Sequence, residues 1–164
     1  MNTVEVENPN FYTTIIESAH QVEREKWNDC ANFKNDDTNI GNPFLSHEFF
    51  CCLEDSGSVS KETGWIAQHI LLSCNNSIVG ILPNFIKNHS WGEYIFDQVF
   101  AQALENAGGK YYPKLLSAVP FSPVPGERFL IKTGYDKKKI KKLLLKALED
   151  LIKIYKFSSG HINF

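Results

Sequence analysis

The eleven residues from 87 to 97 combine a lysine, a histidine, two carboxylates and three aromatic side chains. They follow the apolar run 78–82, and a strand that ends in so mixed a segment usually delivers side chains to the edge of a cleft. Polar groups packed among aromatic rings are costly to bury without partners, so they tend to line a site or tie down a loop. The stretch therefore predicts either a functional site or a well-bonded turn, and the residue types alone do not separate the two.

Glu93 and Asp97 are the candidate general bases in this stretch. His89 is the alternative base, because its unperturbed pKa is close to neutrality. The two carboxylates are four residues apart, so they should share a face only if the segment is helical. For each of the three residues taken alone, a structural role in capping or turn bonding is favoured over catalysis.

Cationic side chains could hold an anionic group of a substrate. Lys87, Lys114 and Arg128 could bind a phosphate or a peptide carboxylate, and an arginine can do so through two parallel hydrogen bonds. Ordinary surface pairing is the alternative, and Arg128 could simply pair with its neighbour Glu127.

Tyrosines complete the set of candidate substrate contacts. Tyr111 and Tyr112 should alternate across a strand, so that one faces the core and the other a cleft. Tyr112 and Tyr94 are the two candidates for substrate binding.

Several other chemistries find no support in the sequence. It contains no glycine-rich phosphate loop, no GxSxG elbow and no metal-ligand spacing, so no metal site is predicted and no cofactor-binding residue is assigned. The cysteines form no CxxC pair, and neither a zinc site nor a disulfide framework is predicted from them. They are Cys30, Cys51, Cys52 and Cys74.

Charge is distributed unevenly along the 164 residues, whose net charge is −2 and whose apolar content is 43%. Residues 132–156 hold nine lysines and three acids, and the rest of the chain is acidic. The lysines at 137–139 oppose the dipole of the helix that they begin, so they are weak candidates for a nucleotide phosphate or a tRNA backbone. A solvated helix face is the favoured explanation, and DNA binding is not expected.

One domain is predicted over residues 11–164, preceded by a disordered terminus over 1–10. Neither a signal sequence nor a run of membrane-spanning length is apparent, so a cytoplasmic protein is expected. Hydrophobic periodicity and turn residues predict the order β-α-α-β-β-α-β-α-β, an α/β (α+β) fold with a mixed sheet flanked by helices. The predicted elements are strand 11–20, helix 22–31, helix 46–55, the hairpin strands 65–73 and 77–87, helix 96–107, strand 111–119, helix 136–155 and strand 158–164. Ser46 and Asp136 are the predicted caps of their helices, and the second of these helices has an apolar face that runs from Ile140 to Tyr155. The predicted irregular segments are the turn-rich stretch 32–42, the hairpin turn Cys74-Asn75-Asn76 and the proline-rich loop 120–126.

A series of short motifs resembles one known family. The motifs are Asn42-Pro43-Phe44-Leu45-Ser46, residues 54–59, Thr63-Gly64-Trp65 with His69, residues 87–97, Tyr111-Tyr112-Pro113-Lys114 and residues 120–123. From about residue 42 to its end, the sequence resembles the FemAB-like N-acyltransferases of the GNAT superfamily, often labelled peptidoglycan-biosynthesis proteins. Small departures are Ala67, Phe85 and Phe100, where the family usually has proline, tyrosine and tryptophan.

The resemblance implies a GNAT-like domain that transfers an acyl or aminoacyl group to an amine. Family members resemble two such halves in tandem, and this sequence is similar to the first half only. The implied donor is acyl-coenzyme A or an aminoacyl-tRNA, and the implied acceptor is the amine of a peptide or a peptidoglycan precursor. Catalysis in such folds depends mainly on positioning and one general base.

Two alternatives remain open at this point. The chain could be a non-catalytic GNAT-like fragment that acts as a binding module and self-associates through the edge of its C-terminal strand. It could instead be a nucleic-acid-binding domain built on the lysine-rich helix, in which case its RNA affinity should fall steeply with salt. Overall acidity makes the second alternative the weaker one.

Overall fold

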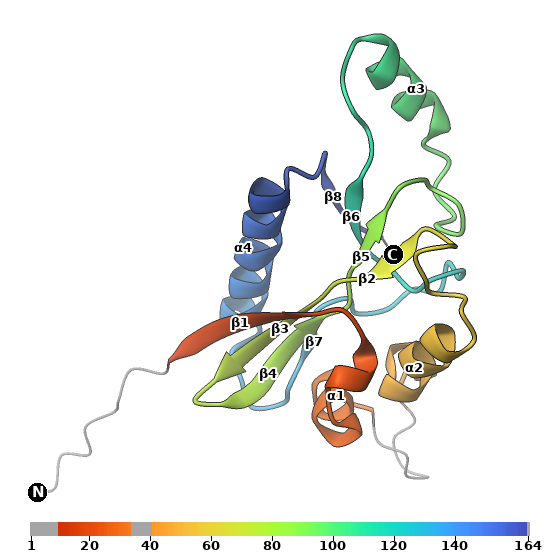
Figure 1. The fold of residues 1–164 in the computed structure, drawn as a ribbon. Coiled ribbons are helices and arrows are strands. Elements are labelled where there is room, and N and C mark those ends of the chain that lie inside the picture. Colours follow the sequence, from red (N-terminus) through yellow and green to blue (C-terminus); the bar gives the residue numbers. More distant parts are fainter. Residues whose placement is uncertain (1–9, 34–40, 164) are drawn as a thin grey trace, which may run out of the picture.

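The computed structural model describes residues 10–33 and 41–163 of the chain. The predicted disordered terminus 1–10 therefore lies almost wholly outside the described residues, as does most of the turn-rich segment 32–42. Figure 1 shows the order of the elements. They are β1 (Phe11–Ile16), η1 (Ala19–Gln21), α1 (Arg24–Ala31), η2 (Pro43–Leu45), α2 (His47–Asp55), β2 (Trp65–Ala67), β3 (His69–Cys74), β4 (Ser77–Leu82), β5 (Phe85–Lys87), α3 (Gln98–Asn106), β6 (Lys114–Ser117), β7 (Leu130–Ile131), α4 (Lys137–Tyr155) and β8 (Gly160–Ile162).

The strands form two four-stranded sheets, in the orders β1-β3-β4-β7 and β2-β5-β6-β8. The first sheet is antiparallel throughout, and the second is mixed because β8 pairs with β6 in parallel. The α/β class with helices on the faces of β-structure is thus confirmed. The β-structure is divided into two sheets, because both strands of the predicted central hairpin are interrupted.

The break lies at Gln68 on one strand and at Asn84 on the other. Pro83, which has no N–H to donate, interrupts the second strand, and the Gln68 N–H still donates to the Asn84 carbonyl at 2.8 Å. His69 accepts a hydrogen bond from the Asn84 N–H at its Nδ1, and its Nε2 faces Glu54 of α2 at 3.7 Å. A buried histidine therefore fixes the point where one sheet ends and the other begins.

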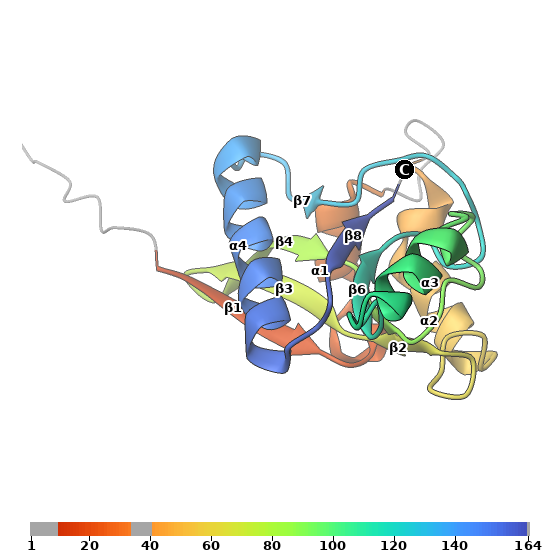
Figure 2. The same cartoon turned by 90° about the horizontal axis from the view of Figure 1, so that it is seen from above.

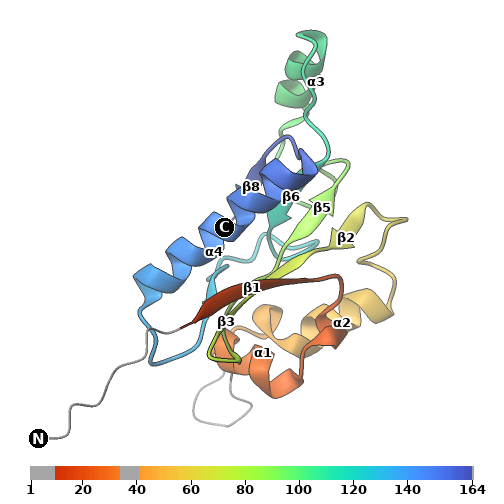
Figure 3. The same cartoon turned by 60° about the vertical axis from the view of Figure 1, so that its left-hand side comes forward.

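Helices cover both faces of the first sheet (Figure 3). On β3, Leu71 belongs to a core shared with Trp27 of α1 and Phe50 of α2. Its neighbour Ile70 belongs to a second core, shared with α4, because successive side chains of a strand point to opposite faces. Each such side chain contributes about 1.5–3 kcal/mol when fully buried, so the two cores hold the three layers together.

The local signals for the hairpin and for two helices are confirmed. Asn75 and Asn76 both have positive φ, of 47° and 65°, as a two-residue type I′ turn requires. Ser46 caps α2 by accepting from Phe49 N–H. Asp136 caps α4 by accepting from the first-turn amides. The predicted apolar residues of α4 face the second core, except for Tyr155, which is exposed.

The helix predicted over 96–107 exists as α3, but its apolar face does not join either core. Only Ala101 is a buried residue of this helix, and the helix projects from the body as an arm (Figure 1). The strand predicted over 111–119 shortens to β6, and β8 lies beside it between α4 and α3 (Figure 2). The base of the arm therefore lies in the same region as β5, β6 and β8.

Candidate functional site

Lys114, the first residue of β6, lies fully buried at the centre of a polar cluster below the arm. Its Nζ donates to Ser90 Oγ at 2.9 Å and to Asp97 Oδ2 at 2.8 Å. The same nitrogen lies 2.8 Å from Glu93 Oε2. Two of the three donors of the ammonium are therefore hydrogen-bonded, and Glu93 adds a second carboxylate at ion-pair distance.

The segment that brings the two carboxylates to Lys114 is a loop and not a helix. Gly92 and Tyr94 have φ values of 79° and 57°, and these left-handed turns fold Glu93 back toward β6. The expectation that Glu93 and Asp97 would need a helix to share a face is therefore wrong. Asp97 precedes α3, but its side chain caps no amide of that helix, because the carboxylate is bound to Lys114 instead.

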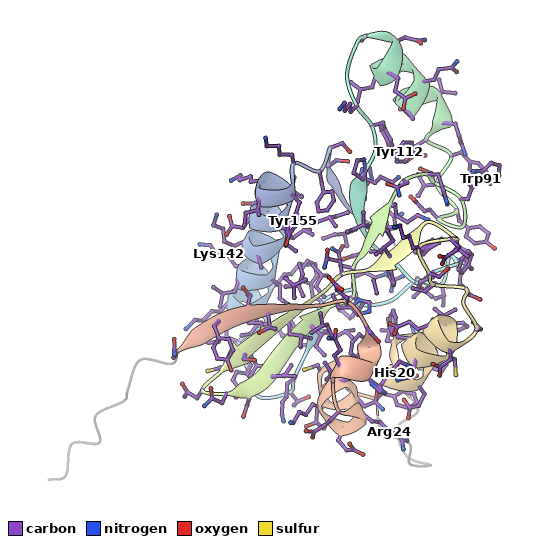
Figure 4. The ribbon with its side chains drawn as sticks, in the orientation of Figure 1. His20, Arg24, Trp91, Tyr112, Lys142 and Tyr155 are labelled. Atoms are coloured by element: carbon purple, nitrogen blue, oxygen red, sulfur yellow. The ribbon has the colours of Figure 1, made fainter. Side chains whose placement is uncertain are left out.

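The two tyrosines before β6 converge on the same cluster. Tyr111 donates its hydroxyl to Asp97 Oδ2 at 2.7 Å, and the Tyr112 hydroxyl lies 2.8 Å from Ser90 Oγ. Their ring centroids are 5.0 Å apart. The predicted alternation across a strand is wrong here because β6 begins only at residue 114. Tyr112 is drawn at the root of the arm in Figure 4.

Lys87 lies opposite Lys114 in the β5–β6 pairing and is also fully buried. Its Nζ donates to the Trp91 carbonyl at 3.2 Å and lies 3.7 Å from the centroid of the Trp65 ring. Burial lowers the pKa of Lys87 to about 7, against the opposing effect of Glu93 and with a further contribution from Lys114. Near neutral pH, Lys87 is therefore present in both its charged and its neutral form.

The two carboxylates have pKa values displaced in opposite directions. Burial raises the pKa of Glu93, although Lys114 opposes the shift. Burial also acts to raise the pKa of Asp97, but hydrogen bonds from Lys114 and Tyr111 help to lower it below its ordinary value. Glu93 Oε1 has no hydrogen-bond partner among the described residues, and Oε2 is close to Lys114 without hydrogen-bond geometry. Such a pair separates into a carboxylate that binds a proton more readily than usual and a partner that releases its proton more readily than usual.

His89 anchors the loop through both ring nitrogens. Its Nε2 lies 3.1 Å from the Thr63 carbonyl oxygen, and its Nδ1 accepts from Trp91 N–H. A neutral imidazole satisfies both contacts, and burial lowers the pKa of His89. Gly64 lies against the ring, where a Cβ atom would come within 2.2 Å of Nε2. These contacts are the ones that a structural role in turn bonding requires.

His161 is a member of the region that sequence reasoning missed. It pairs with Leu116 in the parallel β6–β8 ladder, its ring lies 6.2 Å from the Tyr111 ring, and Ser159 Oγ is 2.9 Å from its Nε2. Burial, together with Lys114, lowers its pKa. Only the pairing of β8 with β6 could have pointed to it, since it lies far along the chain from the stretch 87–97. Ser90 was missed as well, although it lies inside that stretch.

Other predicted site residues lie outside the cluster. Arg128 is buried and donates to the carbonyls of Asn163 and Val124 at 2.9 and 2.7 Å, so it ties the proline-rich loop to the C-terminal strand. Neither Glu127 nor any other described carboxylate forms a salt bridge with it. The lysines at 137–139 lie at the start of α4, away from the cluster (Figure 1).

Two cavities open on the described surface. A cavity of about 290 Å³ is formed by the loop itself and is lined by Ser90, Trp91 and Tyr94 among others. Ser90 belongs to both this cavity and the Lys114 cluster, so the two are in contact. A larger cavity of about 430 Å³ lies between α1 and the start of α4, lined by Leu45, Phe129 and lysines of α4, and it shares no residue with the cluster.

No group of three or more potential metal-ligating side chains occurs among residues 10–33 and 41–163. Within those same ranges, every helix is too short or too polar to cross a membrane.

The fold and the site define an α+β domain with a buried lysine–carboxylate cluster beside a loop-lined cavity. Residues 18–164 match the family model FemAB-like, described as peptidoglycan biosynthesis/recognition. The chain therefore belongs to the FemAB-like family. No curated protein and no solved structure matches this chain.

Proposed function

We propose that the protein acts in peptidoglycan biosynthesis as an N-acyltransferase domain of the FemAB-like family. The acceptor is the primary amine of a peptide or a peptidoglycan precursor, and the donor is acyl-coenzyme A or an aminoacyl-tRNA. The observation that carries the proposal is the pair Glu93 and Asp97. One buried lysine holds both carboxylates, and their pKa values are displaced in opposite directions. Such a pair supplies the general base that acyl transfer to an amine requires.

In the proposed reaction, the acceptor nitrogen attacks the carbonyl carbon of the donor and forms the new C–N bond. Glu93 takes the proton that the nitrogen loses. The C–S bond of the thioester or the C–O bond of the aminoacyl ester breaks, and the departing thiolate or alkoxide receives that proton. The raised pKa of Glu93 suits this transfer, because it makes the carboxylate a stronger base than an ordinary glutamate.

The neighbouring residues position this base. Asp97, which itself accepts from the Tyr111 hydroxyl, holds the Lys114 ammonium in place. That ammonium can stabilise negative charge that develops on the carbonyl oxygen. Ser90, at the boundary between the cluster and the 290 Å³ cavity, is placed to contact a substrate in the cavity. Glu93 itself is 2% exposed, so the loop 90–97 must move aside when the acceptor enters.

The same low exposure of Glu93 favours one alternative function, a binding module that recognises a peptidoglycan peptide without transferring anything to it. In that case the Lys114 cluster would only stiffen the loop, and substrate would contact the cavity alone.

A transfer assay separates the two functions. Labelled acyl-coenzyme A or aminoacyl-tRNA is incubated with a precursor peptide that carries a free primary amine. We expect transfer by the wild type and a loss of about 10²- to 10⁴-fold in rate for Glu93→Gln, with the control Glu62→Gln, an exposed acid, unchanged. Peptide binding by the wild type without transfer from either donor would establish the binding module instead.

A further inference from the structure

We propose that the α3 arm is a docking surface for the α3 arm of a second copy of this chain. The apolar residues that recur at helical spacing on α3 face solvent. Phe96, Val99 and Phe100 are 86%, 78% and 72% exposed, and Ala103 and Ala107 continue the same stripe and are also exposed.

The helix has little to stabilise it within one molecule. α3 has nine residues, whereas isolated helices shorter than about 12–15 residues are marginal in water. Most helical stability in proteins comes from packing of the apolar face, and in this helix that face is largely exposed to solvent. A partner on the stripe would supply the missing packing.

The exposed patch is large enough for a stable interface. Trp91, Tyr94 and Phe96 line one cavity, so the patch runs without a gap from the root of the arm onto α3. Trp91 and Tyr94 are 75% and 52% exposed. At roughly 150–250 Å² for a fully exposed aromatic side chain, these aromatic residues and Phe100 together present roughly 400–700 Å². That area exceeds or matches the largest patch of an ordinary monomer, about 300–600 Å², and with Val99 and Leu104 it approaches the roughly 800 Å² per partner of a specific interface.

The chemistry of the patch favours a protein as its binding partner over a lipid membrane. Residues 88–109 contain no lysine or arginine, whereas helices that lie on anionic membranes carry basic residues on their polar face. The polar residues Gln98, Gln102 and Glu105 lie on the side of the helix opposite the stripe. An uncharged stripe can meet its own copy across a two-fold axis without bringing like charges together, which is the condition for an isologous interface.

A two-fold pair of antiparallel α3 helices gives a specific geometry. Ala103 lies near the middle of the stripe, where its small side chain permits close approach of the two helices. Phe96 and Trp91 form part of the interface and also part of the cavity wall, so pairing of two copies would cover the cavity that adjoins the Lys114 cluster.

Sedimentation equilibrium over a wide range of protein concentration tests the proposal. We expect the wild type to reach twice its monomer mass of 18.7 kDa. Phe100→Asp should weaken the association by at least about 30-fold, as loss of an interface hot spot does. The matched control Gln102→Asp, on the polar side of the same helix, should associate as the wild type does. Both positions are exposed, so neither change should alter the melting temperature of the body.

Cysteine cross-linking tests the geometry. In a Cys52→Ser background, which removes the exposed native thiol, Ala103→Cys should form a disulfide-linked dimer on oxidation and Gln102→Cys should not. A wild type that stays monomeric at every concentration would overturn the proposal. Dimers that persist unchanged in Phe100→Asp would overturn it as well, and would locate self-association elsewhere, for example at the edge of β8.

Discussion

Two buried lysines and two carboxylates meet at the root of the arm, and their charges depend on one another. Lys114 has ionised partners on two sides, whereas Lys87 has only a carbonyl and an aromatic ring within reach. Removing one member of a buried ion pair leaves the other uncompensated, which costs more than the pair itself contributes. The cluster therefore makes predictions that do not depend on a substrate.

Lys114→Met should destabilise the fold by about 3–5 kcal/mol, because Glu93 and Asp97 would remain buried without a cation. Urea unfolding measures the change. Adding Glu93→Gln and Asp97→Asn to the same chain should recover most of the loss, since no unpaired charge then remains. If the triple variant were as unstable as the single one, packing of the lysine stem and not charge would explain the effect.

Lys87→Met should stabilise the protein near neutral pH. The ordinary lysine pKa of 10.5 falls to about 7 at this position, so between these values the unfolded chain binds a proton that the folded chain does not. The unfolding free energy of the wild type should therefore rise with pH across this window, by an amount on the order of a few kcal/mol. The advantage of Lys87→Met should shrink as the pH approaches 10. Thermal melts between pH 7 and pH 10 measure it, and an advantage that does not change with pH would contradict the assigned shift.

At the scale of elements, the sequence predicted those features that depend on local chemistry. Asp136 and the apolar spacing behind it predicted α4, Ser46 predicted the start of α2, and Asn75–Asn76 predicted the hairpin turn. Each is a short-range signal, in which the deciding contacts lie within four residues.

Features that depend on contacts between distant residues were not predictable in this way. The break between the two sheets depends on His69 meeting Asn84, and the place of His161 depends on the parallel pairing of β8 with β6. The exposure of α3 was missed because helical periodicity shows that a stripe is apolar but not what covers it. Of the residues in the Lys114 cluster, the sequence singled out Glu93, Asp97 and Lys114, whereas Ser90 and His161 were not singled out.

Gly64→Ala should displace the loop that carries Glu93 and Asp97. The new methyl group would collide with the His89 ring, and the positive φ of 70° adds strain. Gly57→Ala is a matched control, because Gly57 has φ of 71° and open space around it. We expect the Gly64 variant to be less stable than the Gly57 variant by about 1–3 kcal/mol, the cost of overpacking, as measured by denaturant unfolding. Equal losses of stability would mean that only backbone strain destabilises the Gly64 variant and that the His89 ring moves aside without cost.

At the scale of the whole molecule, a rigid three-layer body carries a projecting arm, and the candidate site lies where they join. The body supplies Lys87 and Lys114 from paired strands, and the loop below the arm supplies Glu93 and Asp97. Loop residues held by a rigid scaffold are a common way to build a site that must open for substrate. Any partner that orders the arm would therefore also restrict the loop that covers Glu93.

Their environment sets Glu93 and Asp97 apart as a proton acceptor and a fixed anion. Carbon-13 NMR titration of the side-chain carboxyl groups tests it directly, with Glu93→Gln and Asp97→Asn used to assign the two signals. We expect the Glu93 carboxyl to titrate above the ordinary glutamate value and the Asp97 carboxyl below the ordinary aspartate value. If Glu93 titrated at or below its ordinary value, it would be an ion-pair partner of Lys114 like Asp97, and its assignment as the general base would fail.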